Sequence, residues 1–118
     1  MKDTEQLNLL AVEFQACQHI LTAIGNPTRH SILLTLIAAG CKDGMRVGEI
    51  MQNTHLSRPT VSHHIRILRE AKIVNVHRLG TKNFYYIDPQ DNSLFMLKNM
   101  INHIEDYMKN HWEPERKN

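Results

Sequence analysis

The sequence predicts a mainly α-helical fold with one β-hairpin placed before the last helix. Three observations predict it. Apolar residues recur at three- and four-residue spacing over most of the chain, which is the period of an amphipathic helix. Between positions 73 and 87 the period falls to about two residues, which is the period of a strand. Gly80 divides that stretch into halves, as the tip of a hairpin does.

The first helix is predicted to run from about Thr4 to Ile24, and Gly25 ends it. A single apolar stripe along this helix indicates that one side of it is buried. The stripe consists of Leu7, Leu10, Ala11, Phe14, Cys17, Leu21 and Ile24.

A second helix is predicted to begin at Asn26 and Pro27. An asparagine side chain caps free N–H groups, and a proline in the first turn has no N–H to leave unpaired. Gly40 ends this helix, because glycine readily adopts the left-handed conformation found after a helix. We expect its apolar residues to face the core: Ile32, Leu33, Leu36 and Ile37.

Two shorter helices follow. Val47, Ile50 and Met51 define a helix of about two turns that breaks at positions 53–55. Ser57 then caps a fourth helix, and Pro59 lies in its first turn, where a missing N–H is harmless. Its buried face is predicted to consist of Val61, Ile65 and Leu68. Two short helices joined by a tight turn form a helix-turn-helix.

The hairpin is predicted to pair residues 73–79 with residues 82–87, and a last helix runs from about Asn92 to Trp112. An apolar seam follows that helix at Leu94, Leu97, Ile101, Ile104 and Met108. Four helices and a hairpin already fill one small core, so we expect the first and last helices to pack on their counterparts in a second subunit. The prediction is a dimeric winged helix-turn-helix of order α-α-α-α-β-β-α, with one domain over residues 1–112 and a charged tail over 113–118.

The charge distribution favours a nucleic-acid partner. The formal net charge is +2, but residues 42–87 hold eight Lys or Arg against three Asp or Glu, so the middle of the chain is basic and the ends are acidic. No apolar run approaches the roughly 20 residues that span a bilayer, and the first residues do not resemble a signal peptide. We therefore expect a cytoplasmic protein without a membrane partner.

The outer face of the fourth helix has the composition of a DNA-reading surface. Small and hydrogen-bonding side chains near its start let the backbone enter the major groove, and arginine and histidine reach base edges and phosphates. Basic residues of the hairpin flank its turn, and we expect them to reach a neighbouring minor groove or phosphates. The predicted DNA contacts are Ser57, Arg58, Thr60, Ser62, His63, Arg66, Arg78 and Lys82.

The stretch LSRPTVSHHIRILREAKIV, followed by HRLGTKNFYYI, closely resembles the recognition helix and wing of the ArsR/SmtB family of bacterial repressors. The resemblance implies a homodimer, joined through its first and last helices, that binds an imperfect inverted repeat in double-stranded DNA. It also implies release from that operator when an effector binds. The expected base and phosphate contacts carried over from the family are Ser57, Arg58, Thr60, Ser62 and His63.

Two of the family's effector sites have partial matches here. Members that bind metal across the dimer use an Asp-x-His pair and a His-x-x-Glu or His-x-x-His pair on the last helix. His103 and Asp106 match the second pair, but nothing matches the first, so a site for zinc or another divalent metal lacks donors. Members that sense persulfides or oxidants use two cysteines. Cys41 resembles the first of these, and Cys17 is a conceivable partner for it.

The sequence therefore leaves three kinds of effector open: a metal, a thiol oxidant and an organic ligand.

A different class of function is a winged-helix module that binds protein and has lost DNA recognition. The basic middle segment argues against that alternative, because a protein-binding module would not need Arg58, Arg66, Arg78 and Lys82 on one face. An enzyme is not expected, since no nucleophile elbow, phosphate loop or zinc-protease motif occurs in the sequence.

Overall fold

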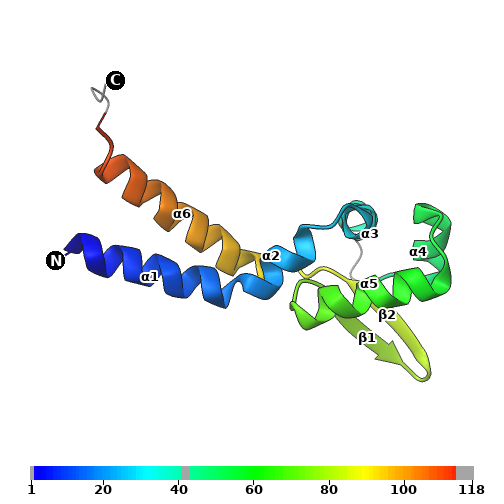
Figure 1. The fold of residues 1–118 in the computed structure, drawn as a ribbon. Helices are drawn as coiled ribbons and strands as arrows, with labels where there is room; N and C mark the ends of the chain where they lie inside the picture. Colours follow the sequence, from blue (N-terminus) through cyan, green and yellow to red (C-terminus); the bar gives the residue numbers. More distant parts are fainter. Residues whose placement is uncertain (1, 41–42, 114–118) are drawn as a thin grey trace.

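The computed structural model describes residues 2–40 and 43–113, and Figure 1 shows its elements. The helices are α1 (Lys2–Ala16), α2 (Gln18–Ile24), α3 (Pro27–Ala39), α4 (Val47–Thr54), α5 (Arg58–Glu70) and α6 (Leu94–Asn110), and the strands are β1 (Asn75–Leu79) and β2 (Lys82–Tyr86). Helices α2 to α5 and the hairpin form a body, and α1 and α6 project from it side by side as an arm (Figure 1).

The single first helix that the sequence predicts is in fact two helices, because the chain leaves helical geometry at Cys17 (φ −91°, ψ 5°). Hydrogen bonds continue across the break, from the Cys17 N–H to the Glu13 carbonyl at 2.9 Å and from the Leu21 N–H to the Cys17 carbonyl at 2.9 Å. The two halves differ in their main partners: α1 lies along α6, whereas α2 packs on α3 and α5 and also touches the start of the arm at α6. The break lets each half turn its apolar side toward its own partner.

The boundaries predicted for the second helix are confirmed in α3. The Asn26 side chain accepts a hydrogen bond from the Arg29 N–H at 3.1 Å, and Gly40 ends the helix with a φ of 52°. The prediction that Ile37 faces the core is wrong, since its side chain is 58% exposed. Ile37 lies about 100° around the helix from the buried Leu36, and this rotation takes it out of the core.

The helix-turn-helix is confirmed in its details. Helix α4 ends at His55, which has a φ of 60°, and the Ser57 hydroxyl accepts from the Thr60 N–H at 3.4 Å to cap α5. The predicted inner face of α5 is buried: Val61, Ile65 and Leu68.

The hairpin is antiparallel, with Leu79 opposite Lys82 and a two-residue turn between them. Both strands are shorter than predicted, because residues 73 and 74 lie in the core before β1 begins and residue 87 follows β2. Met45 pairs with Tyr85 through N–H to carbonyl bonds of 2.7 and 2.8 Å, which fixes the hairpin to the segment before α4. A side chain at Gly44 would lie 2.9 Å from Phe84, so only glycine fits this close approach.

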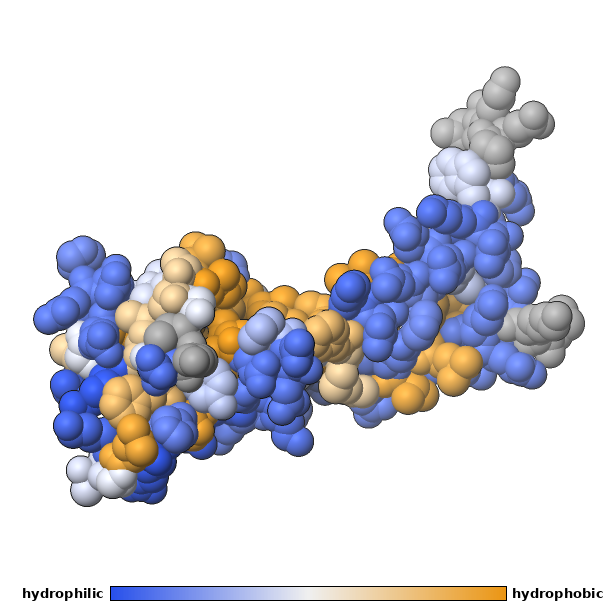
Figure 2. Space-filling model, turned by 180° about the vertical axis from the view of Figure 1, so that it is seen from behind, coloured by the Kyte–Doolittle hydropathy of each residue, from blue (hydrophilic) through white to orange (hydrophobic). Residues whose placement is uncertain are grey.

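The arm leaves a large apolar surface uncovered in one chain. Its exposed apolar residues are Leu7, Leu9, Val12 and Phe14 of α1 and Phe95, Met96, Ile101 and Met108 of α6. In Figure 2, seen from behind, apolar surface is visible among the polar side chains of the arm, on the right. The radius of gyration is 18.3 Å, whereas a compact chain of this length has about 13.5 Å. None of the helices over residues 2–40 and 43–113 is long and apolar enough to cross a membrane.

Candidate nucleic-acid interface

The residues buried on the inner face of α5 determine which residues lie on its outer face. Burial of Val61, Ile65 and Leu68 fixes the rotation of the helix about its axis. Ser62, His63 and Arg66 lie on the outside and are all exposed. An exposed polar face on the second helix of a helix-turn-helix is the arrangement that enters the major groove.

The first turn of α5 is held together by its own hydroxyl groups. The Ser57 and Thr60 hydroxyl oxygens lie 2.8 Å apart in a hydrogen bond, and the Thr60 side chain is half-buried. Both predicted contact residues therefore order the helix start. Arg58 is exposed beside them.

A polar hollow of about 510 Å³ opens next to this helix start, between α4, α5 and the hairpin. Arg46 and Arg58 line it together with Asn83 of β2. Arg46 was not among the predicted DNA contacts, although a basic residue before the first helix of a helix-turn-helix is a signal that could have identified it. Glu49 also lines this hollow and accepts from the Arg46 N–H, but the two guanidinium groups outnumber its carboxylate, so the hollow favours an anion such as a backbone phosphate.

The two basic residues of the hairpin do not lie on one face of it. Because Leu79 pairs with Lys82 and Arg78 pairs with Asn83, Arg78 and Lys82 lie on opposite faces. Arg78 shares its face with Asn83, which lines the hollow beside Arg58. The expectation that all four basic residues converge on one face is therefore wrong for the hairpin, and Arg78 is the member on the side of α5.

The positive charges of this surface are available to a ligand. In the described part of the chain, the salt bridges are His103–Glu13, Lys109–Glu105 and His111–Asp3, all within the arm. None of them uses Arg58, Arg66, Arg78 or Lys82, which are all exposed. Cations without a protein partner are the groups that replace counterions on nucleic-acid phosphates.

Behind α5 the structure contains a buried arginine that the sequence analysis missed. Arg29 of α3 is only 7% exposed. Its side chain donates to the carbonyls of Ala23 at 2.7 Å and Thr22 at 3.0 Å, and to Nδ1 of His64 at 3.1 Å. The pKa of His64 is lowered below 6.5 by burial first, and then by the charges of Arg29 and His63.

The predicted metal ligands lie in the arm. His103 donates from Nδ1 to the Glu13 carboxylate at 2.7 Å, and Asp106 lines the same small hollow between α1 and α6. No group of three or more His, Cys, Asp or Glu residues suited to a metal occurs within residues 2–40 and 43–113. Zinc normally has four protein ligands in a structural site, so one chain does not supply a complete site there. Metal binding at His103 and Asp106 stays a prediction.

Only one cysteine of the predicted thiol pair lies among the described residues. Cys17 is a free thiol, 1% exposed, in the core cluster. Cys41 lies outside the described residues. A redox role for the pair stays a prediction.

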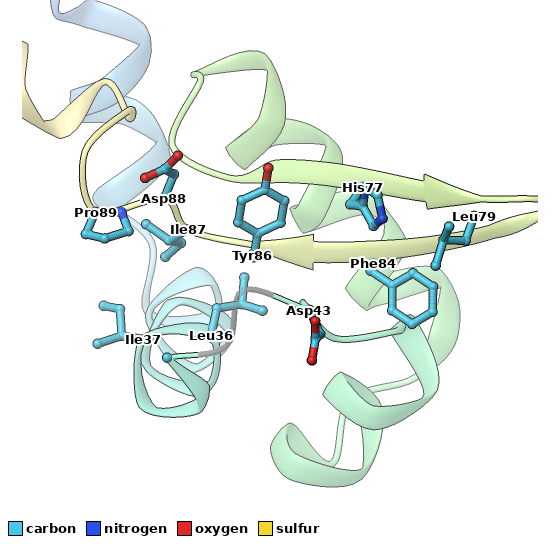
Figure 3. A pocket seen from close by; sticks show the side chains of 11 residues that line it. Leu36, Ile37, Asp43, His77, Leu79, Phe84, Tyr86, Ile87, Asp88 and Pro89 are labelled. Carbon is cyan, nitrogen blue, oxygen red and sulfur yellow. The ribbon is translucent and has the colours of Figure 1, made fainter.

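A cavity of about 780 Å³ lies between the C-terminal end of α3 and the hairpin (Figure 3). One wall is formed by Leu36 and Ile37 of α3, and the opposite wall by side chains of both strands. The full lining is Leu36, Ile37, Gly40, Asp43, His77, Leu79, Phe84, Tyr86, Ile87, Asp88 and Pro89. The cavity thus lies between α3 and the hairpin and is lined largely by apolar side chains.

Comparison with known proteins identifies the group to which these features belong. Residues 26–76 match the model of the arsR family of bacterial regulatory proteins. An uncharacterized HTH-type transcriptional regulator of Methanocaldococcus jannaschii is 40% identical over 75 residues, which cover 64% of this chain and 81% of that protein. The transcriptional repressor SdpR of Bacillus subtilis is 36% identical over 87 residues, covering 71% and 91% of the two chains.

The fold has the same relatives. A homodimeric winged helix-turn-helix DNA-binding domain from Mycobacterium bovis superposes with a TM-score of 0.59 at 21% identity, over 87% of this chain and 92% of that one. The predicted fold class, a winged helix-turn-helix, is confirmed by this match, and the relatives are regulators and not enzymes. The chain belongs to the ArsR family of bacterial transcriptional regulators and carries the family's winged helix-turn-helix DNA-binding domain.

Proposed function

We propose that the chain is a cytoplasmic repressor that binds an imperfect inverted repeat as a homodimer and reads each half-site with α5. The observation that carries this proposal is the two-sided character of α5. Its inner face is fixed in the core, and its outer face presents Ser62, His63 and Arg66 without a protein ion pair among the described residues. The relative SdpR is named a repressor, which supports the direction of regulation.

The homodimer is supported by the apolar surface of the arm. Exposed side chains such as Val12 and Ile101 lie on α1 and α6, and a second copy of the same arm would cover them. A two-fold axis between the arms would relate the two α5 helices, one for each half of an inverted repeat. The Mycobacterium bovis domain with this fold is described as homodimeric, which supports the same assembly.

The effector that the geometry favours is a small organic molecule bound in the cavity between α3 and the hairpin. Its volume of about 780 Å³ falls within the range of about 300 to 1,000 Å³ of small-molecule sites. Leu79 and Ile37 on its rim are both exposed, so an apolar ligand would remove them from water. Because the ligand would touch both α3 and the hairpin, binding would change their relative position and with it the fit to DNA.

The experiment that tests DNA reading is selection of duplexes from a random-sequence library, followed by fluorescence anisotropy at several salt concentrations. A repressor of this kind enriches a two-fold related sequence, and its affinity for that sequence falls steeply with salt. Failure to enrich any sequence, or binding that salt leaves unchanged, would instead indicate a protein-binding module.

The effector cavity is tested separately, with the uncharged dye Nile red as the probe. Leu79→Glu places a charge on the rim of the cavity and should abolish the rise in dye fluorescence. Leu34→Glu is the matched control, since Leu34 of α3 is also an exposed apolar residue but does not line the cavity. Equal dye binding by wild type and both variants would rule out this cavity as the ligand site.

A further inference from the structure

Arg29 connects three helices, α2, α3 and α5, through the hydrogen bonds of one side chain. The residue belongs to the first turn of α3. Its Nε and Nη2 atoms donate to the carbonyls of Ala23 and Thr22, at the end of α2, and its Nη1 atom donates to His64 of α5. The end of α2 leads back to α1, so one side chain bridges the base of the arm and the DNA-reading helix.

The hydrogen bond between Arg29 and His64 determines the protonation of the imidazole. Guanidinium has five N–H donors and no acceptor, so Nδ1 of His64 must provide a lone pair. The ring is therefore neutral, with its proton on Nε2. A second proton at Nδ1 would place two donors 3.1 Å apart and would remove the bond.

His64 also lies beside a residue on the outer face. The rings of His63 and His64 form an edge-to-face contact with centroids 5.0 Å apart. His63 is exposed on the side predicted to contact DNA, whereas His64 is half-buried. A shift of His64 away from Arg29 would therefore be passed on to a DNA-contacting side chain and to the rotation of α5.

We propose that Arg29 and a neutral His64 are positioning residues that hold α5 at the angle needed to read the operator. The inference rests on the proposed DNA-reading function. Neither residue needs to touch DNA. Loss of their bond leaves the phosphate-binding charges in place but misaligns the side chains that contact bases, so specific binding falls while non-specific binding persists.

The same bond makes specific binding sensitive to acid. The charged or titratable side chains that act on His64 are Arg29 from α3 and His63 from α5, and α2 contributes backbone carbonyls to the network. Both side chains oppose a positive charge on His64, and burial opposes it first. The contribution of the neutral His64 ring to the free energy of unfolding is therefore fully present above pH 6.5. It is lost as the pH falls below that value.

The test compares two substitutions that place an acceptor at different ends of the ring. His64→Asn puts a carbonyl oxygen near the position of Nδ1, whereas His64→Gln puts it near the position of Nε2. Anisotropy is measured on the selected operator and on a scrambled duplex at 20 °C, after circular dichroism has shown each variant to be folded. An unsatisfied buried donor in the Gln variant should lower operator affinity by about 5- to 150-fold and leave scrambled-duplex affinity unchanged.

The Asn variant should bind the operator within about threefold of wild type and should lack the additional loss of affinity that wild type shows below pH 6.5. Wild-type specificity in a folded Gln variant would overturn the proposal, as would identical pH profiles of wild type and the Asn variant. If wild type itself failed to prefer the operator, the proposed DNA-reading function would be wrong instead.

Discussion

His111 and Asp3, 108 positions apart in the chain, lie in contact where the free ends of α6 and α1 meet: Nε2 of the histidine is 2.8 Å from Oδ1 of the aspartate. The other ring nitrogen bonds the Tyr107 carbonyl at 2.9 Å, and the ring stacks on Tyr107 with centroids 4.1 Å apart. Both oxygen partners accept, so both nitrogens can donate only in the imidazolium form, which the two contacts therefore favour. This is the opposite protonation state from His64.

The first prediction concerns the titration of His111. Its pKa is raised above 6.5, chiefly by the hydrogen bond from the ring to Asp3 and then by the bond to the Tyr107 carbonyl. A raised pKa means that the contact stabilises the arm below pH 6.5 and that this stabilisation is lost as the pH rises through the folded-state value. An NMR titration should show His111 above 6.5 in wild type and lower in Asp3→Asn. Asp91→Asn, on the exposed loop before α6, should leave the titration unchanged.

The second prediction concerns base reading by α5. Arg66→Ala should weaken operator binding by about 1 to 3 kcal/mol and relax specificity at one position of each half-site. The matched control is Arg69→Ala, which removes the same charge from the same helix. Arg69 lines a different hollow, with Lys72 and Asp91, on the side of α6. Equal losses in the two variants would show that net charge alone, and not a base contact, accounts for the effect.

The third prediction separates the two basic residues of the hairpin. Arg78 shares a face with Asn83 beside the hollow that Arg58 lines, whereas Lys82 is on the other face. Arg78→Ala should reduce the slope of log affinity against log salt by about one, as the loss of one phosphate contact does. Lys82→Ala should change the slope less. A larger change for Lys82 would mean that the opposite face of the hairpin meets DNA.

The fourth prediction tests the arm as the dimer interface. Ile101→Lys places a charge in the exposed apolar surface of α6 and should convert the dimer to a folded monomer in sedimentation velocity experiments, because burying an unpaired ammonium group is costly. Leu34→Lys is the matched control on α3, where the side chain is exposed but belongs to the body. If Ile101→Lys sediments like wild type, another surface joins the subunits.

Much of the fold was predictable because it depends on neighbours in the sequence. Asn26 and Ser57 cap helices through atoms three residues away, and the inner face of α5 follows from its spacing. The break at Cys17 was not predictable, since neither glycine nor proline marks it in the sequence.

The candidate site, too, has features that the sequence predicts and features that it does not. The exposed face of α5 follows from the helical period once the buried face is known. Arg29 gave no such signal, because its acceptors are the carbonyls of two residues six and seven positions earlier and a histidine 35 positions later. The opposite directions of Arg78 and Lys82 follow from the two-residue turn, so the predicted hairpin already implied them.

The most direct test of the central claim is a hydroxyl-radical footprint of the selected operator. A homodimer that reads DNA with two α5 helices should protect two half-sites related by a two-fold axis, with centres about 34 to 36 Å apart or a multiple of that distance. The protected nucleotides should coincide with the enriched sequence, and Arg66→Ala should need a higher protein concentration for the same protection. Protection of one isolated half-site by a monomer would contradict the account.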